Sequence, residues 1–268
     1  MADRQSVSAT IEKYLENIYR LEKEDGIART AKIAGRVGVS LGTVTNTIET
    51  LERKGLVTHK PYRGVKLTEA GRRHALDVIR RHRLSERLLT DLLKMEWSQV
   101  HDYASQLEHA LPDDVLQSLD VALGHPARCP HGNPVPTPNG TLPVEHSQPL
   151  NTLAPGQSGT ILKIGEERRD YLEYIEALHL LPGMRIQILK QEPFDGPIII
   201  RAQGTTHILG QKIAAIIHVQ AERCDQNVNS VNRTRRRKTR DYRFSSNNSK
   251  SRLNKTSSPS YPSSTSSF

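Results

Sequence analysis

The feature that most constrains the fold is a three-residue interruption between two helical patterns near the N-terminus. Residues 30–37 and 41–54 each place apolar side chains at helical spacing, and Gly38-Val39-Ser40 separates them. A glycine can close the first helix, and the Ser40 hydroxyl can cap the start of the second. A helix over residues 10–24 comes before this pair, and two short strands around residues 61–64 come after it. This order predicts a winged helix-turn-helix.

The third predicted helix has one apolar face, formed by Val44, Ile48 and Leu51, and one polar face. Asparagine can pair with adenine through two hydrogen bonds, threonine can contact the thymine methyl group, and basic side chains in the wing can reach phosphates. The sequence therefore predicts DNA binding, with a packing hairpin or a protein-binding winged helix as alternatives. The candidate DNA-binding residues are Ser40, Gly42, Thr43, Thr45, Asn46, Lys60 and Arg63, with Lys66 beside them.

The net charge of +9 is concentrated at the C-terminal end and says little about the rest of the chain. Residues 225–268 hold ten Lys and Arg and two Asp, so this segment carries +8 and the other residues about +1. The segment is rich in Ser, Asn and Arg with few apolar side chains, which predicts disorder. No apolar run is long enough to span a bilayer, no signal-peptide core is visible, and two cysteines make a disulfide framework improbable. We expect a cytoplasmic protein without a membrane partner.

Histidine and glutamate recur at helical spacing in the second predicted domain. His82 and Glu86 are four residues apart, and His101, Glu108 and His109 share one face of the next predicted helix. Imidazoles and carboxylates from two helices suit a divalent first-row metal, for which Glu12 and Glu16 offer further oxygens. Satisfied core histidines are the alternative. Cys129-Pro130-His131 lacks a second close pair, so we interpret it as a rigid turn rather than a metal site.

The remaining pattern predicts a mainly α protein with a small β barrel. A long helix with a bend covers residues 69–94, further helices cover 97–111 and 112–124, and a Pro-rich linker covers 126–155. Strand-like runs, among them residues 215–219, surround one helix at 166–178. The predicted domains are 1–72 (winged helix-turn-helix), 73–146 (helical metal and dimerisation domain with the linker), 147–224 (SH3-like barrel) and 225–268 (disordered tail).

Several of these segments together resemble the diphtheria-toxin-repressor family of metal-dependent regulators, which includes iron-dependent repressors and manganese transport regulators. The resemblance covers residues 8 to about 224, and its clearest segments are 14–19, 40–46, 51–57, 81–89, 108–109 and 129–134. It implies a homodimer on double-stranded operator DNA and Mn(II) or Fe(II) as cofactor. The metal ligands that it implies are His82, Glu86 and His101 at an ancillary site, Glu167 and Asp170 from the barrel, and Glu108, His109 and Glu16.

Two positions depart from the family pattern. Where relatives supply Met or Asp this chain has Lys13, and where they supply Cys or Glu it has Ser105. A lysine ammonium cannot ligate a metal unless it is deprotonated. The site that normally sets the choice of metal is therefore lost, or rebuilt with Glu12, Asp102 or Glu16, or replaced by a charge pair between Lys13 and Glu108.

We therefore expect a metal-dependent transcriptional regulator, most simply a repressor of manganese or iron homeostasis genes. A regulator of the same fold that has lost metal sensing is the first alternative. A metallo-hydrolase built on the His and Glu cluster is a remote one, because no nucleophile motif or Gly-rich phosphate loop is present. We expect no enzymatic activity and no small organic substrate.

Overall fold

The structure of the chain is a computed structural model that describes residues 8–60 and 63–222. The predicted disordered tail and the tip of the predicted wing, Pro61 and Tyr62, lie outside the described residues. Within the described part, no helix is long and apolar enough to cross a membrane.

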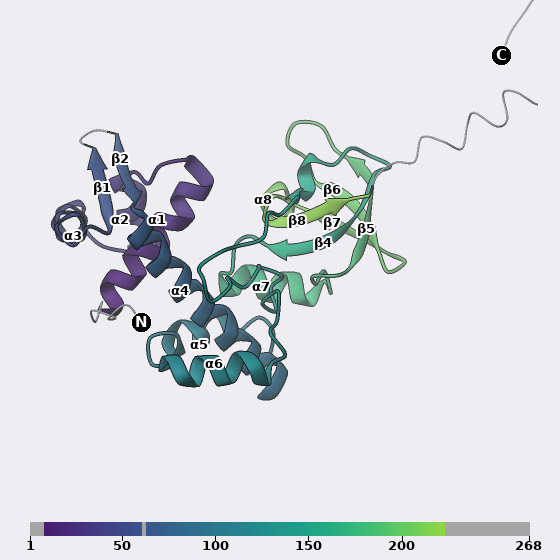
Figure 1. The fold of residues 1–268 in the computed structure, drawn as a ribbon. Coiled ribbons are helices and arrows are strands. Elements are labelled where there is room, and N and C mark those ends of the chain that lie inside the picture. Colours follow the sequence, from purple (N-terminus) through teal and green to yellow (C-terminus); the bar gives the residue numbers. More distant parts are fainter. Residues whose placement is uncertain (1–7, 61–62, 223–268) are drawn as a thin grey trace, which may run out of the picture. The chain divides into compact units, whose positions relative to one another are not determined.

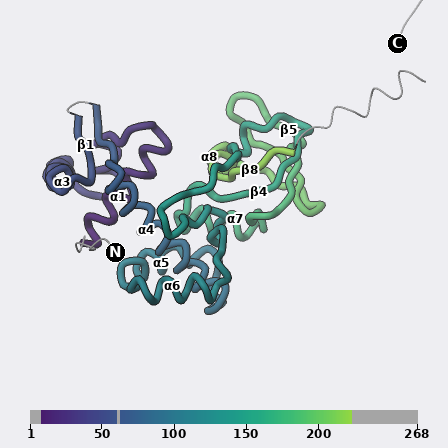
Figure 2. Tube along the Cα trace, viewed as in Figure 1, coloured from purple at the N-terminus to yellow at the C-terminus, as the bar shows by residue number. Residues whose placement is uncertain are grey.

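The N-terminal part is a winged helix-turn-helix, as the sequence predicts (Figures 1 and 2). Its elements are α1 (Ala9–Asp25), α2 (Thr30–Val37), α3 (Leu41–Arg53), β1 (Val57–Lys60) and β2 (Gly64–Leu67). Gly38 ends α2 with a φ of 78°, and the Ser40 hydroxyl caps α3 by accepting a hydrogen bond from the Thr43 amide at 3.2 Å. Val44, Ile48 and Leu51 are buried in a core that also contains the apolar face of α1. The opposite face of α3 is therefore left at the surface.

Helix α4 (Glu69–Arg87) continues into a π-helical turn, η1 (Leu88–Leu92), within the region predicted to be one long helix with a bend. Two shorter helices follow, α5 (Val100–Leu107) and α6 (Asp113–Ala122). Thr68 caps α4, because its hydroxyl accepts a hydrogen bond from the Gly71 amide. Since α4 packs against α1, α5 and α6, it is the element from which the candidate site is built.

Residues 128–136, called the strap here, are irregular but are held to α4 by arginines. Arg80 donates to the carbonyl oxygen of Pro136 at 2.8 Å, Arg87 to that of Arg128 at 2.7 Å, and Arg83 to that of Pro134. These arginines are three and four residues apart and so share one face of α4. The strap also pairs with the end of β4, because the Ile164 amide donates to the His131 carbonyl oxygen at 2.9 Å. The region predicted to be a linker therefore holds its residues in fixed positions.

The C-terminal part contains a six-stranded antiparallel sheet in the order β3-β8-β4-β5-β6-β7. Its elements are β3 (Gln148–Pro149), η2 (Leu150–Thr152), β4 (Ser158–Ile164), α7 (Arg169–Ala177), β5 (Arg185–Gln191), β6 (Ile198–Ala202), β7 (Thr205–Leu209), α8 (Gln211–Ile216) and β8 (Ile217–Ala221). Within the described residues no pairing of β3 with β7 closes the predicted barrel. The predicted strand 215–219 is also wrong at its start, where α8 continues to Ile216.

Candidate metal centre

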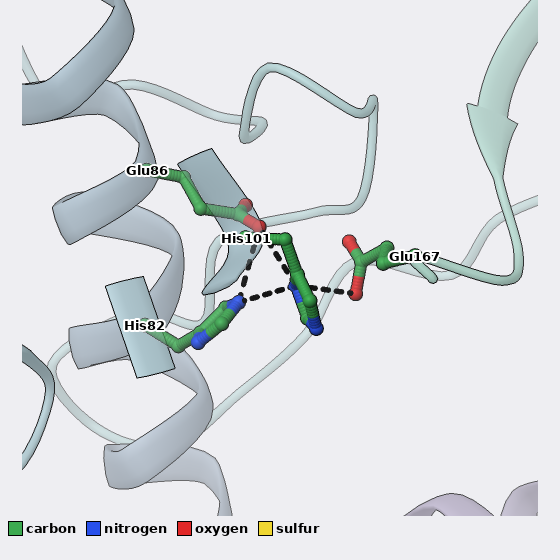
Figure 3. Close-up of side chains that lie close together, drawn as sticks. All are labelled: His82, Glu86, His101 and Glu167. Atoms are coloured by element: carbon green, nitrogen blue, oxygen red, sulfur yellow. Dashed lines mark hydrogen bonds and ion pairs between the residues drawn. The ribbon is translucent and has the colours of Figure 1, made fainter. Parts of the chain in front are cut away.

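His82 and Glu86 lie one turn apart on α4 and point to the same side, toward His101 of α5 and Glu167 (Figure 3). His82 Nε2 is 3.0 Å from Glu86 Oε1 and 2.9 Å from His101 Nδ1. Glu167, which lies in the loop before α7, places Oε2 3.6 Å from His101 Nδ1. One donor atom from each of these side chains lies within 4.8 Å of all the others, so the predicted His and Glu set converges on one point.

A second group overlaps the first and includes the strap. It consists of Glu86, Cys129, His131 and Glu167, all buried, and their donor atoms also lie within 4.8 Å of one another. His131 Nδ1 is 3.1 Å from Glu86 Oε1, while its Nε2 is 3.0 Å from the Trp97 carbonyl oxygen. Because Nε2 must donate to that carbonyl, Nδ1 faces the carboxylates either with a second proton or as a free lone pair. The interpretation of Cys129-Pro130-His131 as only a rigid turn therefore missed two candidate donors.

Glu108 lies behind His82 and sets its orientation. Glu108 Oε2 is 2.6 Å from His82 Nδ1, so the Nε2 atom of His82 faces the cluster. Metal-binding histidines commonly use their second nitrogen in this way. Glu108 Oε1 is also 3.2 Å from His109 Nε2, and His109 Nδ1 is 2.6 Å from Glu12 Oε2. The predicted ligands Glu108 and His109 thus adjoin the cluster, and Glu12 joins them from α1.

The charges in the cluster hold one another in their ionised forms. Burial alone would raise the pKa of Glu86, but the adjacent His131 and His82 bring it well below its usual range. Burial would lower the pKa of His82, but Glu86 and Glu108 bring it well above its usual range. Burial together with the Glu86 and Glu167 carboxylates raises the pKa of the Cys129 thiol well above its usual value. Glu86 and His82 thus stabilise each other's charged forms inside the buried cluster.

Other predicted ligands lie outside the cluster. The Asp170 side chain is 60% exposed and pairs with Arg168, so its prediction as a barrel-derived ligand is not supported by this geometry. Glu16 pairs with Arg20, with Glu16 Oε1 2.8 Å from Arg20 Nη2. Lys13 is exposed and, within residues 8–60 and 63–222, forms no ion pair with Glu108, whose partners are His82 and His109. The predicted charge pair between Lys13 and Glu108 is therefore absent from the described residues.

The predicted DNA-binding residues occupy the free face of α3 and the wing. Ser40, Gly42, Thr43, Thr45 and Asn46 are all exposed, as are Lys60 and Arg63 on either side of the wing tip. The threonine hydroxyls are used locally: Thr43 Oγ1 lies 2.9 Å from Ser40 Oγ, and Thr45 Oγ1 donates to the Leu41 carbonyl oxygen at 3.0 Å. In the described part of the chain the Asn46 amide makes no hydrogen bond, so it is available to a partner.

Three family models match consecutive parts of the chain. The iron dependent repressor N-terminal DNA binding domain matches residues 6–65, the iron dependent repressor metal binding and dimerisation domain matches 68–137, and the FeoA domain matches 148–221. The matched ranges cover all of the candidate donors and all of the candidate DNA-binding residues.

Individual relatives give the same result. The chain is 43% identical over 222 residues to the diphtheria toxin repressor of Corynebacterium glutamicum, covering 79% of this chain and 96% of that protein. With the diphtheria toxin repressor of Corynebacterium efficiens it shares 43% identity over 127 residues, or 47% of this chain and 55% of that one. The iron-dependent repressor IdeR of Mycobacterium tuberculosis is 42% identical over 127 residues, with 47% and 55% covered, so these two alignments span about half of each relative.

Solved structures extend the similarity to the whole described fold. A manganese-dependent transcriptional repressor in complex with manganese superposes with a TM-score of 0.72 at 33% identity, covering 79% of this chain and all of that one. The crystal structure of IdeR from T. acidophilum superposes with a TM-score of 0.68 at 29% identity, covering 81% of this chain and all of that one.

Proposed function

The chain belongs to the iron-dependent repressor family of metal-dependent, DNA-binding transcriptional repressors, and on this premise we propose how its own residues carry that function. We propose that Mn(II) or Fe(II), held by the cluster around Glu86, controls the binding of a homodimer to double-stranded operator DNA in the cytoplasm. The family consists of repressors and not enzymes, which agrees with the absence of a nucleophile motif in the sequence.

The donor set fits a divalent first-row cation. Glu86 is completely buried, and its Oε2 atom has no hydrogen-bond partner in the described structure. An unpartnered buried carboxylate oxygen is costly unless a cation or proton compensates it. The single observation that carries the proposal is therefore this orphaned oxygen, because it belongs to Glu86, which together with Glu167 is shared by both donor groups.

His82, Glu86, His101 and Glu167 would hold the metal, with Cys129 and His131 as the neighbouring donors of the second group. When bound, the metal supplies two positive charges that neutralise the carboxylates. The chain's own residues then determine the effect: the donors come from α4, α5, the strap and the loop before α7, so their convergence fixes these segments relative to one another. Because α4 also packs against α1, we infer that this convergence favours one orientation of the winged helix-turn-helix.

The proposal is tested by titrating DNA from upstream of the protein's own gene with the purified full chain. Electrophoretic mobility or fluorescence measures the DNA affinity. The titration is run with a chelator and then with manganese, iron and zinc in turn. We expect DNA affinity to rise with metal and to fall with salt. DNA binding that is unaffected by the chelator would instead support the alternative regulator that has lost metal sensing, in line with Lys13 and Ser105.

Replacing Asn46 with alanine should weaken operator binding by roughly 10- to 100-fold, because a free amide on α3 would lose its contacts with a base edge. Competition with non-specific DNA measures the effect, and the specific affinity should fall while the non-specific affinity does not. Lys60→Ala is the contrast: it should weaken both and reduce the salt slope by about one. Equal losses of specific and non-specific binding in Asn46→Ala would contradict its role in base reading.

A further inference from the structure

Arg20 of α1 lies between two carboxylates that come from different parts of the chain. Its Nη2 and Nε atoms are 2.8 and 3.1 Å from Glu16 Oε1. Its Nη1 atom is 3.5 Å from Glu167 Oε2. The side chain of Arg20 is 31% exposed, whereas that of Glu167 is only 4% exposed, so the contact with Glu167 is largely shielded from water. Arg20 therefore places a permanent positive charge of the winged helix-turn-helix at the edge of the metal cluster.

The two oxygens of Glu167 have different surroundings. Oε1 accepts a hydrogen bond from Asn133 Nδ2 of the strap at 2.8 Å and lies 3.7 Å from His131 Nδ1. Oε2 lies 3.6 Å from His101 Nδ1 and is the atom joined to His101 by a dashed line in Figure 3. The Glu167 oxygen nearest to His101 is thus the same atom that Arg20 approaches.

We propose that Arg20 competes with the divalent metal for Glu167 and so raises the metal concentration needed for the response. The inference rests on the proposed function. A guanidinium stays protonated at all relevant pH values, and a nearby like charge disfavours a second cation in a buried site. Because Arg20 belongs to α1, its contact with Glu167 also connects the winged helix-turn-helix to the loop before α7. By linkage, whatever weakens this contact favours metal, and metal weakens the contact.

The test is a calorimetric titration of the full chain with Mn(II). Arg20→Met removes the charge, keeps most of the bulk and should lower the Kd for Mn(II) about tenfold. Arg20→Lys keeps a charge and should stay within about threefold of the original chain. Arg36→Met is the matched control, because Arg36 also pairs with a glutamate, Glu24 at 2.6 Å, but lies on α2 away from the cluster. It should leave Mn(II) affinity unchanged.

Thermal unfolding gives a second readout that does not depend on DNA binding. Without metal, Arg20→Met leaves Glu16 and Glu167 without their shared cation and should unfold at a lower temperature than the original chain. Added Mn(II) should then raise its unfolding temperature by more than it raises that of the original chain. A rise in the unfolding temperature of Arg20→Met that is equal to or smaller than that of the original chain would contradict competition between Arg20 and the metal.

A Glu167→Gln background decides through which carboxylate Arg20 acts. If the competition is for Glu167, the gain from Arg20→Met should disappear in that background. A gain that persists would overturn the inference and point to Glu16. Tight Mn(II) binding by the original chain with no gain in Arg20→Met would refute the inference alone. If neither protein binds Mn(II), and neither binds Fe(II) in the same titration, both the inference and the proposed function are wrong.

Discussion

Glu86→Gln should lower the affinity of the chain for Mn(II) by more than about 100-fold, the largest effect that we expect of any single substitution. Changes in residues that only support a ligand typically cost 10- to 100-fold, and Glu86 is a central donor. Its Oε1 atom lies 3.0, 3.2 and 3.1 Å from nitrogens of His82, His101 and His131. A glutamine keeps the shape but removes the charge that holds these imidazoles together. Calorimetric titration with Mn(II) measures the loss.

Glu69→Gln is the matched control for this prediction. Glu69 lies on the same helix and pairs with Arg73 at 3.3 Å, but its side chain is 90% exposed, so Mn(II) affinity should not change. Thermal unfolding in chelator shows whether Glu86→Gln still folds, which separates loss of a ligand from loss of the structure. A folded Glu86→Gln protein that binds Mn(II) within about threefold of the original affinity would remove Glu86 from the site.

The parts of the fold that depend on local patterns could be predicted from the sequence. Val44, Ile48 and Leu51 repeat at helical spacing and are all buried, and the Ser40 cap is a contact between residues three apart. His82 and Glu86 form a pair within one helix, so their shared direction follows from helical geometry. The long helical pattern over residues 69–94 also indicated an irregularity, which the structure places in the π-helical turn at Leu88–Leu92.

Contacts between distant segments could not be predicted in this way. His131 reaches Glu86 because three arginines hold the strap against α4, and no spacing in the sequence shows this. The Cys129-Pro130-His131 triplet was the available signal, but without a second close Cys or His pair its spacing favours a rigid turn over a metal site. Arg20 carries no signal in the sequence, because its partner Glu167 lies in a distant part of the chain.

The differences between prediction and structure in the C-terminal part have local causes. Asp170 lies in the first turn of α7, where Arg168 pairs with it at the surface, while Glu167 comes just before the helix and turns inward. Residues 213–219 form an apolar run whose first part is helical and whose last part is a strand. A short apolar run of this kind has no periodicity that distinguishes the two.

Gly132→Ala should destabilise the chain by about 3 kcal/mol or more and should also weaken Mn(II) binding. Gly132 has a φ of 85°, and a Cβ at this position would lie 2.0 Å from the Leu162 carbonyl oxygen, a backbone atom of β4. The strap would have to move away from β4, and the hydrogen bond from the Ile164 amide to the His131 carbonyl oxygen would break. Because His131 contacts Glu86, that movement would carry a donor out of the cluster.

Gly140→Ala separates this effect from the general cost of a left-handed residue. Gly140 follows the strap with a φ of 71°, but the nearest atom to its Cβ would be Arg73 Cγ at 3.8 Å, an ordinary contact. Its alanine variant should lose only about 1–2 kcal/mol and keep the original Mn(II) affinity. Denaturant unfolding and Mn(II) titration of both variants measure the difference. Equal losses of stability, or an unchanged Mn(II) affinity in Gly132→Ala, would mean that the fit of the strap against β4 does not position His131, and that the second donor group forms independently of it.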